Sequence, residues 1–193
     1  MTISEPDLRP RSGRPRDPAC DEAILRATRE VFTESGYSGV SVEGIAARAG
    51  VGKATIYRRY SSKAHLVVEA IRDGSVVEDH LPDSGNLRAD LITMMQPLAD
   101  HLRGENAKLL TTFAMERVRH PDLAEEFNRS VIGKKREHMR RLVMAAIERG
   151  ELRPDADGEL IAESLPAFLW HHAVYNLPIT ADLLDRVLDL ALR

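Results

Sequence analysis

Hydrophobic residues recur along most of the chain at the three- and four-residue spacing that places them on one face of an α-helix. The first such stripe contains Ile24, Thr28 and Val31, begins near Pro18 and stops at Gly36. Proline suits the first turn of a helix, and glycine suits a left-handed end. The alternating patterns and Asn-Gly turns that are typical of strands are almost absent. The chain is therefore predicted to be all-α.

The same periodicity and its interruptions predict about nine helices. Ser41 is a suitable N-cap for a short second helix, which Gly50 would end. A third helix is expected over residues 52–60, and a fourth should run from Ser61 or Ser62 to about residue 78. Five more are expected over residues 87–103, 106–119, 120–149, 157–176 and 180–192, with Gly133 as a candidate break in the third of these.

Charge is divided unevenly between the two parts of the chain. Residues 1–65 carry 11 Lys and Arg against 8 Asp and Glu, whereas the whole chain carries 27 against 30. A basic head on an acidic body indicates a module that binds a polyanion, joined to a part with another task. We therefore divide the chain into a flexible basic arm (residues 1–17), a polyanion-binding head (18–65) and a body (66–193).

Composition argues against several other classes of protein. The apolar runs are far shorter than the roughly 20 residues that span a bilayer, and the amino-terminal segment lacks the apolar core of a secretory signal. We expect a cytoplasmic protein with no membrane partner. Cys20 is the single cysteine, so no intrachain disulfide is possible. The sequence contains no recognisable motif for a catalytic reaction, a cofactor or a metal, so none of these is expected.

Two of the predicted helices form a helix-turn-helix pattern. They meet across Ala49, Gly50 and Val51, where small residues allow close approach and glycine allows a tight turn. Five basic residues and no acidic one lie between Arg48 and Lys63. The second helix of the pair would therefore be able to enter the major groove of DNA.

The same segment resembles a known DNA-binding signature. Residues 40–66 read VSVEGIAARAGVGKATIYRRYSSKAHL. The order of Ile-Ala, Ala-Gly-Val, Thr-Ile-Tyr and Ser-Lys within them is similar to that of the TetR family of transcriptional regulators. The sequence departs from the common pattern of the family at Gly52, Arg59, Tyr60 and Ser61. These departures bear on base preference and not on the class of protein.

This resemblance makes the third predicted helix the recognition helix. Its short side chains Ala54 and Thr55 would reach base edges, and its longer side chains would reach phosphates or guanine. Tyr60 is also a candidate for the core, and the arginine-rich arm is either a solubilising tail or a minor-groove contact of the AT-hook kind. The full set expected to contact DNA is Arg14, Arg16, Ser41, Lys53, Ala54, Thr55, Tyr57, Arg58, Tyr60 and Lys63.

For the body, the resemblance implies a site for a small-molecule effector. The candidates are soft and aromatic side chains, although such residues at helical spacing belong to the core more often than to a pocket. They are Met94, Met95, His101, Phe113, Met115, Phe127, Met139, Phe168, Trp170 and His171. A basic run, residues 129–141, is either a solvated face or a hint of an anionic partner.

The resemblance also implies a homodimer. The last two predicted helices have more apolar surface than one subunit needs to bury, so two pairs could form a four-helix bundle. The interface candidates are Leu160, Ile161, Leu165, Leu169, Leu184, Val187, Leu188 and Ala191.

Together these features predict a repressor that binds a pseudo-palindromic operator as a homodimer and is released by a small molecule. Two alternatives remain at this point. The protein could be a ligand-dependent activator, or it could be a helical small-molecule-binding protein or enzyme that uses the head to tether itself to DNA.

Overall fold

The computed structural model describes residues 17–74, 81–104 and 106–192, and the regular structure in these ranges is entirely helical. The helices are α1 (Pro18–Gly39), α2 (Val42–Ala49), α3 (Lys53–Tyr57), α4 (Lys63–Gly74), α5 (Leu87–Arg103), α6 (Ala107–Arg119), α7 (Pro121–Phe127), α8 (Gly133–Glu148), α9 (Gly158–Val174) and α10 (Leu183–Ala191). A π-helical turn, Asn128–Ile132, joins α7 to α8 into one continuous run. The described residues therefore form nine helical runs. The all-α prediction is confirmed.

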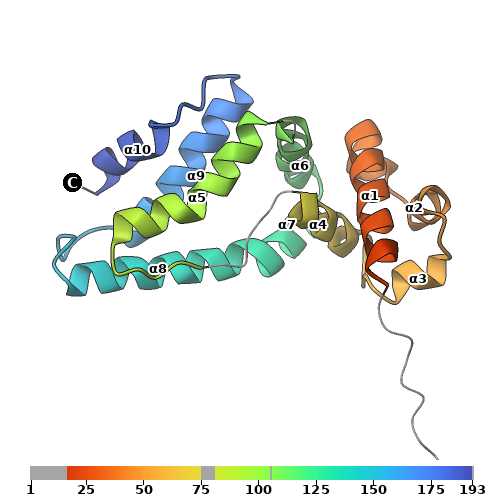
Figure 1. The fold of residues 1–193 in the computed structure, drawn as a ribbon, viewed down its shortest axis with the longest axis horizontal. Coiled ribbons are helices and arrows are strands. Elements are labelled where there is room, and N and C mark those ends of the chain that lie inside the picture. Colours follow the sequence, from red (N-terminus) through yellow and green to blue (C-terminus); the bar gives the residue numbers. More distant parts are fainter. Residues whose placement is uncertain (1–16, 75–80, 105, 193) are drawn as a thin grey trace, which may run out of the picture.

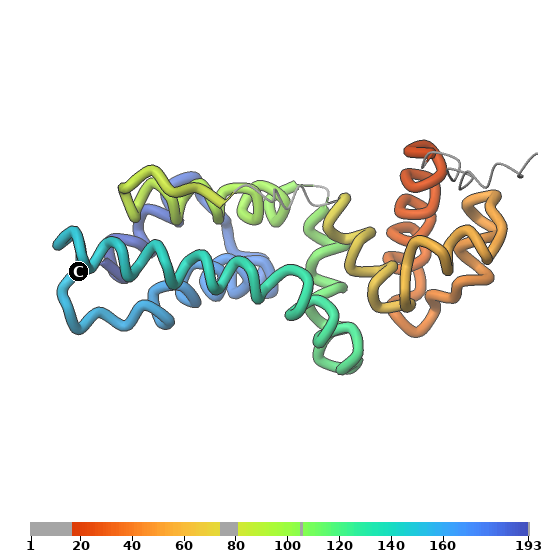
Figure 2. The backbone as a smooth tube through the Cα atoms, turned by 90° about the horizontal axis from the view of Figure 1, so that it is seen from below, coloured from red at the N-terminus to blue at the C-terminus, as the bar shows by residue number. Residues whose placement is uncertain are grey.

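The helices form an elongated molecule with three regions (Figure 1). Helices α1, α2 and α3 lie at one end, and α5, α8, α9 and α10 lie at the other. Helices α4, α6 and α7 occupy the middle, and the view from below in Figure 2 shows the same order. Because α4 packs against both α1 and α7, it connects the two ends. None of the described helices is long and apolar enough to cross a membrane.

Helix caps that the sequence indicates determine the shape of the region formed by α1, α2 and α3. Ser41 accepts a hydrogen bond from the amide of Gly44 at 3.1 Å, and Gly50 ends α2 with a φ of 68°. Gly36 has a φ of 65° and interrupts α1 near its end. Helix α4 begins at Lys63, and the hydroxyl of Ser62 caps it by accepting from the amide of His65 at 3.0 Å.

Helix α3 is shorter than the sequence predicts, because it ends at Tyr57 instead of continuing to residue 60. Its N-cap, Gly52, has no side chain to cap the helix. The chain makes one further turn, in which the amide of Tyr60 donates to the carbonyl of Ile56 at 2.9 Å. That turn directs the ring of Tyr60 into the core.

A continuous core joins the two ends of the molecule. Ile24, Ile45 and Ile56 are almost completely buried where α1, α2 and α3 meet. Phe32 of α1 packs against Phe113 of α6 with ring centroids 6.2 Å apart. Phe113 in turn packs against Phe127, with centroids 4.9 Å apart. This row of aromatic rings joins α1 to the middle region of the molecule.

Polar contacts complete the packing of the second end. Arg88 on α5 forms ion pairs of 2.9 Å with Asp185 and Asp189 on α10. The buried carboxylate of Asp90 accepts the amide of Ser84 at 3.0 Å. His138 of α8 is also buried, with its Nε2 2.7 Å from the carbonyl oxygen of Pro82.

Candidate DNA-binding surface and effector cavity

Helix α3 presents an exposed face on a buried anchor. Ile56 is buried, while the neighbouring Tyr57 has 60% of its surface exposed. Lys53, Ala54 and Arg58 are exposed as well, and Thr55 is half-buried. Because a single apolar contact fixes this short helix to the core, its remaining side chains are available to a groove of DNA.

Most of the basic residues around α3 have acidic partners within the protein. The ammonium of Lys53 lies 2.8 Å from Glu43, and the guanidinium of Arg48 lies 3.0 Å from Glu34. Arg59 is ion-paired with Asp21 of α1 and is only 13% exposed, so it holds α3 against α1. Arg58 makes no ion pair with any described residue and is exposed.

Two predicted contacts, Tyr60 and Lys63, are directed into the protein. Tyr60 is 8% exposed, and burial is the main cause that raises its pKa to about 12. This geometry favours the core interpretation of Tyr60. The ammonium of Lys63 lies 4.2 Å from the centre of the Tyr37 ring, and burial lowers the pKa of Lys63. Ser41 is exposed and caps α2, and Arg14 and Arg16 lie outside the described residues.

A polar cluster connects the end of α1 with α6 and α7. The amide of Tyr37 donates to Oε2 of Glu116 at 2.9 Å, and the hydroxyl of Tyr37 donates to Asp122. Burial and the hydrogen bond to Asp122 raise the pKa of Tyr37 above its ordinary value. The ring of His120 packs on Tyr37 with centroids 4.8 Å apart. Sequence reasoning missed this cluster, because its members are separated by 79 and 85 positions along the chain and form no local pattern.

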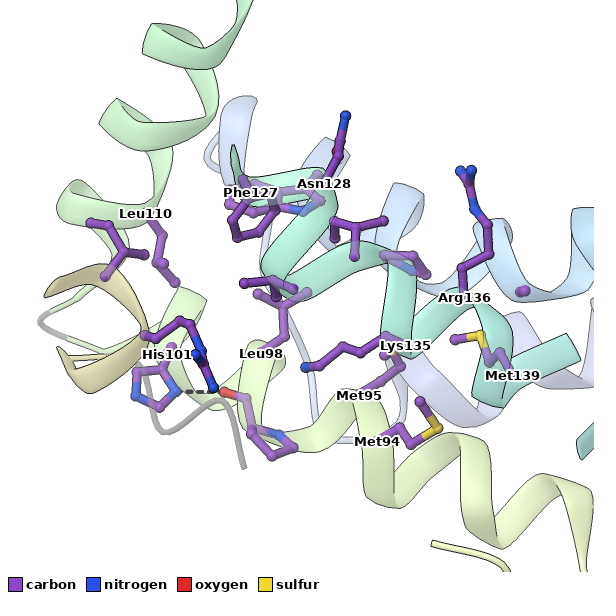
Figure 3. Close-up of a pocket in the computed structure, with 18 of the residues that line it drawn as sticks. Met94, Met95, Leu98, His101, Leu110, Phe127, Asn128, Lys135, Arg136 and Met139 are labelled. Carbon is purple, nitrogen blue, oxygen red and sulfur yellow. Dashed lines mark hydrogen bonds between the residues drawn. The ribbon is translucent and has the colours of Figure 1, made fainter. Parts of the chain in front are cut away.

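A cavity of about 350 Å³ lies among α5, α6, α8 and α9, with α4 and α7 at its edge. Figure 3 shows side chains from these elements converging on it. Its volume is at the lower end of the range for small-molecule sites, about 300–1,000 Å³. Seven of the ten effector-pocket candidates line it: Met94, Met95, His101, Phe113, Phe127, Met139 and Trp170.

The other three candidates lie outside the cavity lining. Met115 is 50% exposed and Phe168 is 40% exposed, and His171 is also on the surface. The reason is helical geometry, because residues one or two positions from a cavity-facing residue on the same helix face elsewhere. No group of three or more His, Cys, Asp or Glu that could hold a metal occurs in the described part of the chain.

The cavity is basic as well as apolar. Among the described residues that line it are four cationic side chains, Arg72, Arg117, Lys135 and Arg136, and one carboxylate, Glu163. Figure 3 shows Lys135 extending from α8 into the cavity and Arg136 turning away from it. Arg136 pairs with Glu163 at 2.9 Å. Lys135 and Arg136 belong to the basic run that the sequence presents as a solvated face or an anion site.

Arg117 of α6 is the unusual member of this group, and sequence reasoning missed it. Its guanidinium carbon lies 4.7 Å from the centre of the Phe127 ring and 5.8 Å from that of Phe113. Its Nε is buried without a hydrogen-bond partner among the described residues. Burial without a neighbouring acid lowers the pKa of Arg117, although a guanidinium remains charged at neutral pH.

Two prolines inside helices also line the cavity. Pro97 lies within α5 and Pro166 lies within α9. A proline has no amide hydrogen, so the carbonyl four residues before it loses its helical partner. Those carbonyls belong to Thr93 and Ala162, which line the same cavity.

The dimer-interface candidates differ in how deeply they are buried within one subunit. Six of the eight are buried inside the subunit itself: Ile161, Leu165, Leu169, Leu184, Val187 and Leu188. Helix α10 packs on α9 and α5, and this packing already covers its apolar stripe. Ala191 is half-buried, and Leu160 is 66% exposed. The apolar side chains of α9 and α10 that remain exposed include Leu160, Phe168 and Leu190.

This arrangement defines a class of protein, a helix-turn-helix head joined to a helical body with a cavity, and comparisons with known proteins identify the family. Residues 24–70 match the family described as bacterial regulatory proteins, tetR family. Residues 81–191 match the family described as tetracyclin repressor-like, C-terminal domain. The chain belongs to the TetR family of DNA-binding transcriptional regulators, so the resemblance noted in residues 40–66 is confirmed.

Individual relatives agree with this assignment. The chain is 30% identical over 175 residues to the uncharacterized HTH-type transcriptional regulator YdeS of Bacillus subtilis, covering 91% of this chain and 86% of the relative. It is 29% identical over 169 residues to the DNA-binding transcriptional repressor TetR of Mycobacteroides abscessus, covering 86% and 88%. The crystal structure of the regulator FadR from Bacillus subtilis in complex with stearoyl-CoA superposes with a TM-score of 0.67 at 20% identity, covering 89% and 97%.

Proposed function

We propose that the protein is a homodimeric repressor that binds operator DNA through α3 and is released when a small molecule occupies the cavity. The observation that carries this proposal is the position of α6. Arg117 of α6 lines the cavity, while the adjacent Glu116 holds the amide of Tyr37 at the end of α1. A ligand that shifts α6 would therefore act directly on the helix that supports the DNA-binding head. The role assigned here is regulatory and not enzymatic.

Release by a ligand requires a difference in affinity between two states. The effector must bind more tightly to the geometry in which the two heads no longer fit successive grooves of DNA. A coupling free energy of about 1–3 kcal/mol would weaken operator binding by about 5- to 150-fold. The Tyr37 cluster is the element that we expect to differ between the two states, because it connects the cavity wall with the head.

A dimer is supported by apolar surface that remains open on α9 and α10, around Leu160, Phe168 and Leu190. A two-fold dimer formed there would present two α3 helices to a pseudo-palindromic operator. Sedimentation velocity should show a dimer that Leu160→Glu dissociates into monomers. Val118→Glu is the matched control, because Val118 is 84% exposed on α6, outside that surface. Equal dissociation by both variants, or by neither, would argue against this interface.

The proposal is tested with purified protein and the DNA upstream of its own coding region. Binding should be steeply salt-dependent and should be lost in Tyr57→Ala, because Tyr57 is the most exposed aromatic side chain of α3. The melting temperature of Tyr57→Ala should remain that of the wild type. If the wild type retards no fragment of that DNA at low salt, the repressor proposal is wrong. If an added effector strengthens binding, the protein is an activator.

A further inference from the structure

We infer that the cavity takes a compact organic anion, a free carboxylate on an apolar body, and that Arg117 binds the carboxylate. This inference rests on the proposed function, because it names the chemical class of the effector. It begins with the guanidinium of Arg117, whose Nε is buried without a hydrogen-bond partner among the described residues. Buried polar groups in folded proteins are nearly always hydrogen-bonded, so such an atom calls for a missing partner.

No carboxylate among the described residues forms an ion pair with Arg117. Glu116 accepts the amide of Tyr37, and Oε2 of Glu126 is ion-paired with Arg129, while Oε1 of Glu126 is buried without a hydrogen bond to the guanidinium. What surrounds the guanidinium is the two rings of Phe113 and Phe127. These rings hold it by cation–π contact but accept no N–H in the plane of the guanidinium. A carboxylate suits that plane, because its two oxygens can accept two parallel N–H groups.

The remainder of the cavity indicates the rest of the ligand. Met94, Met95, Met139 and Trp170 line it, and such side chains adapt to an apolar body. Of the four lining cations, Arg72 is ion-paired with Glu69 and Arg136 with Glu163. The positive charge offered to a ligand therefore comes from Arg117 and from Lys135, which extends into the cavity (Figure 3). The volume of about 350 Å³ favours a compact molecule over one that carries a large nucleotide group.

The test uses four ligands that share a ten-carbon chain: decanoate, decanol, decyltrimethylammonium and decanoyl-CoA. Binding is followed by the fluorescence of Trp170, which is the single tryptophan of the chain and lines the cavity. Decanoate should bind about tenfold to a hundredfold more tightly than decanol, because charge-assisted hydrogen bonds are lost in the alcohol. The cationic ligand should bind most weakly.

Variants locate the anion site on the full-length chain. Arg117→Met should bind decanoate and decanol equally, and Arg117→Lys should retain a reduced preference for decanoate. Arg119→Gln is the matched control, because Arg119 is an exposed arginine on the same helix that does not line the cavity. It should bind all four ligands as the wild type does. The ligand series measured on the wild type decides the question even if Arg117→Met does not fold.

Three results would overturn the inference. The first is equal affinity of the wild type for decanoate and decanol, or a preference for decanoate that survives in Arg117→Met. The second is binding of decanoyl-CoA that is tighter than binding of decanoate, with the same ratio of affinities in Arg117→Met. That result would mean that the protein recognises the charge of the nucleotide group. The third is no binding of any ligand. DNA retardation on the same preparations separates these failures from failure of the proposed function, because operator binding does not depend on the class of effector.

Discussion

One arginine of the head and one arginine of the body lie in opposite surroundings. In the head, Arg59 is 13% exposed and paired with Asp21, and Arg29 pairs with Asp73 and with the carbonyl of Ala70. In the body, Arg117 is half-buried against aromatic rings, with its Nε buried and no ion-pair partner among the described residues. A cation with a partner fixes the geometry of helices, whereas we infer that the cation without one binds a ligand. The ion pairs of Arg59 and Arg29 therefore stabilise the shape of the head, whereas Arg117 is the residue that we propose to bind a ligand in the body.

The largest expected effect tests whether head and body are one cooperative unit. Phe32 is fully buried in α1 and packs against Phe113 of the body. Phe32→Ala should lower the free energy of unfolding by about 3–5 kcal/mol, because it leaves a large cavity between the two regions. The measurement is urea denaturation followed by Trp170, which reports on the body.

An unchanged midpoint for Trp170 in Phe32→Ala would show that the body unfolds independently of the head. Tyr57→Ala serves as the control for loss of an aromatic ring from the head. Because Tyr57 is largely exposed, its replacement should change the free energy of unfolding by about 0.5 kcal/mol or less.

The sequence predicts the local features of this fold well. Caps and apolar periodicity located the helices to within a few residues, because Ser41, Gly50 and Pro121 act through their immediate neighbours. The expected recognition helix was too long, since periodicity cannot show that Tyr60 turns into the core. Most of the pocket candidates chosen by helical spacing do line the cavity, because a pocket between helices is lined by the same faces that form the core.

The features that the sequence could not show depend on contacts between distant segments. The hydrogen bond between Tyr37 and Glu116 joins residues 79 positions apart. Nothing in the sequence distinguishes Arg117 from the other arginines, because its contacts with the rings of Phe113 and Phe127 are seen only in the structure. The apolar stripe of α10 illustrates the same limit, because its spacing cannot tell whether α9 of the same subunit or a second subunit covers it.

The next prediction concerns Arg58, an exposed cation beside α3 that makes no ion pair with any described residue. Arg58→Gln should weaken operator binding about tenfold and reduce the salt dependence of log K by about one phosphate contact. Replacing Arg58 should not affect folding, because its side chain is exposed and supports no other element. Fluorescence anisotropy with labelled DNA at several salt concentrations provides the measurement.

Arg153→Gln is the control for this change in net charge. Arg153 is also exposed, and it lies on the connector between α8 and α9, far from α3 (Figure 1). Equal weakening by the two variants would mean that overall charge, and not a contact made by Arg58, governs affinity.

A smaller effect is expected from the junction between head and body. Tyr37→Phe removes the hydroxyl that donates to Asp122 and should lower the free energy of unfolding by about 1 kcal/mol at neutral pH. Because the folded state raises the pKa of Tyr37, the unfolded chain releases this proton first, above about pH 10. The stabilisation is therefore complete below that pH and is lost as the pH rises.

Urea midpoints measured from pH 7 to pH 11 check the sign of this contribution. The decline above pH 10 should be shallower in Tyr37→Phe than in the wild type. It should not vanish, because burial also raises the pKa of Tyr60, to about 12. Parallel curves for the wild type and Tyr37→Phe would show that the hydroxyl of Tyr37 does not stabilise the folded state in this way.

The smallest effect concerns the exposed pair of Lys53 and Glu43, which are 2.8 Å apart. The hydrogen bond from Lys53 is the main cause that lowers the pKa of Glu43, so this carboxylate is ionised at neutral pH and competes with phosphate for the ammonium. Glu43→Gln should tighten operator binding by about twofold to threefold. Glu34→Gln removes the nearer of the two acidic partners of Arg48, leaving Glu30 at 3.8 Å; because Arg48 is outside the proposed contacts, affinity should be unchanged. If both variants tighten binding equally, the general field of the head attracts DNA and Lys53 makes no contact of its own.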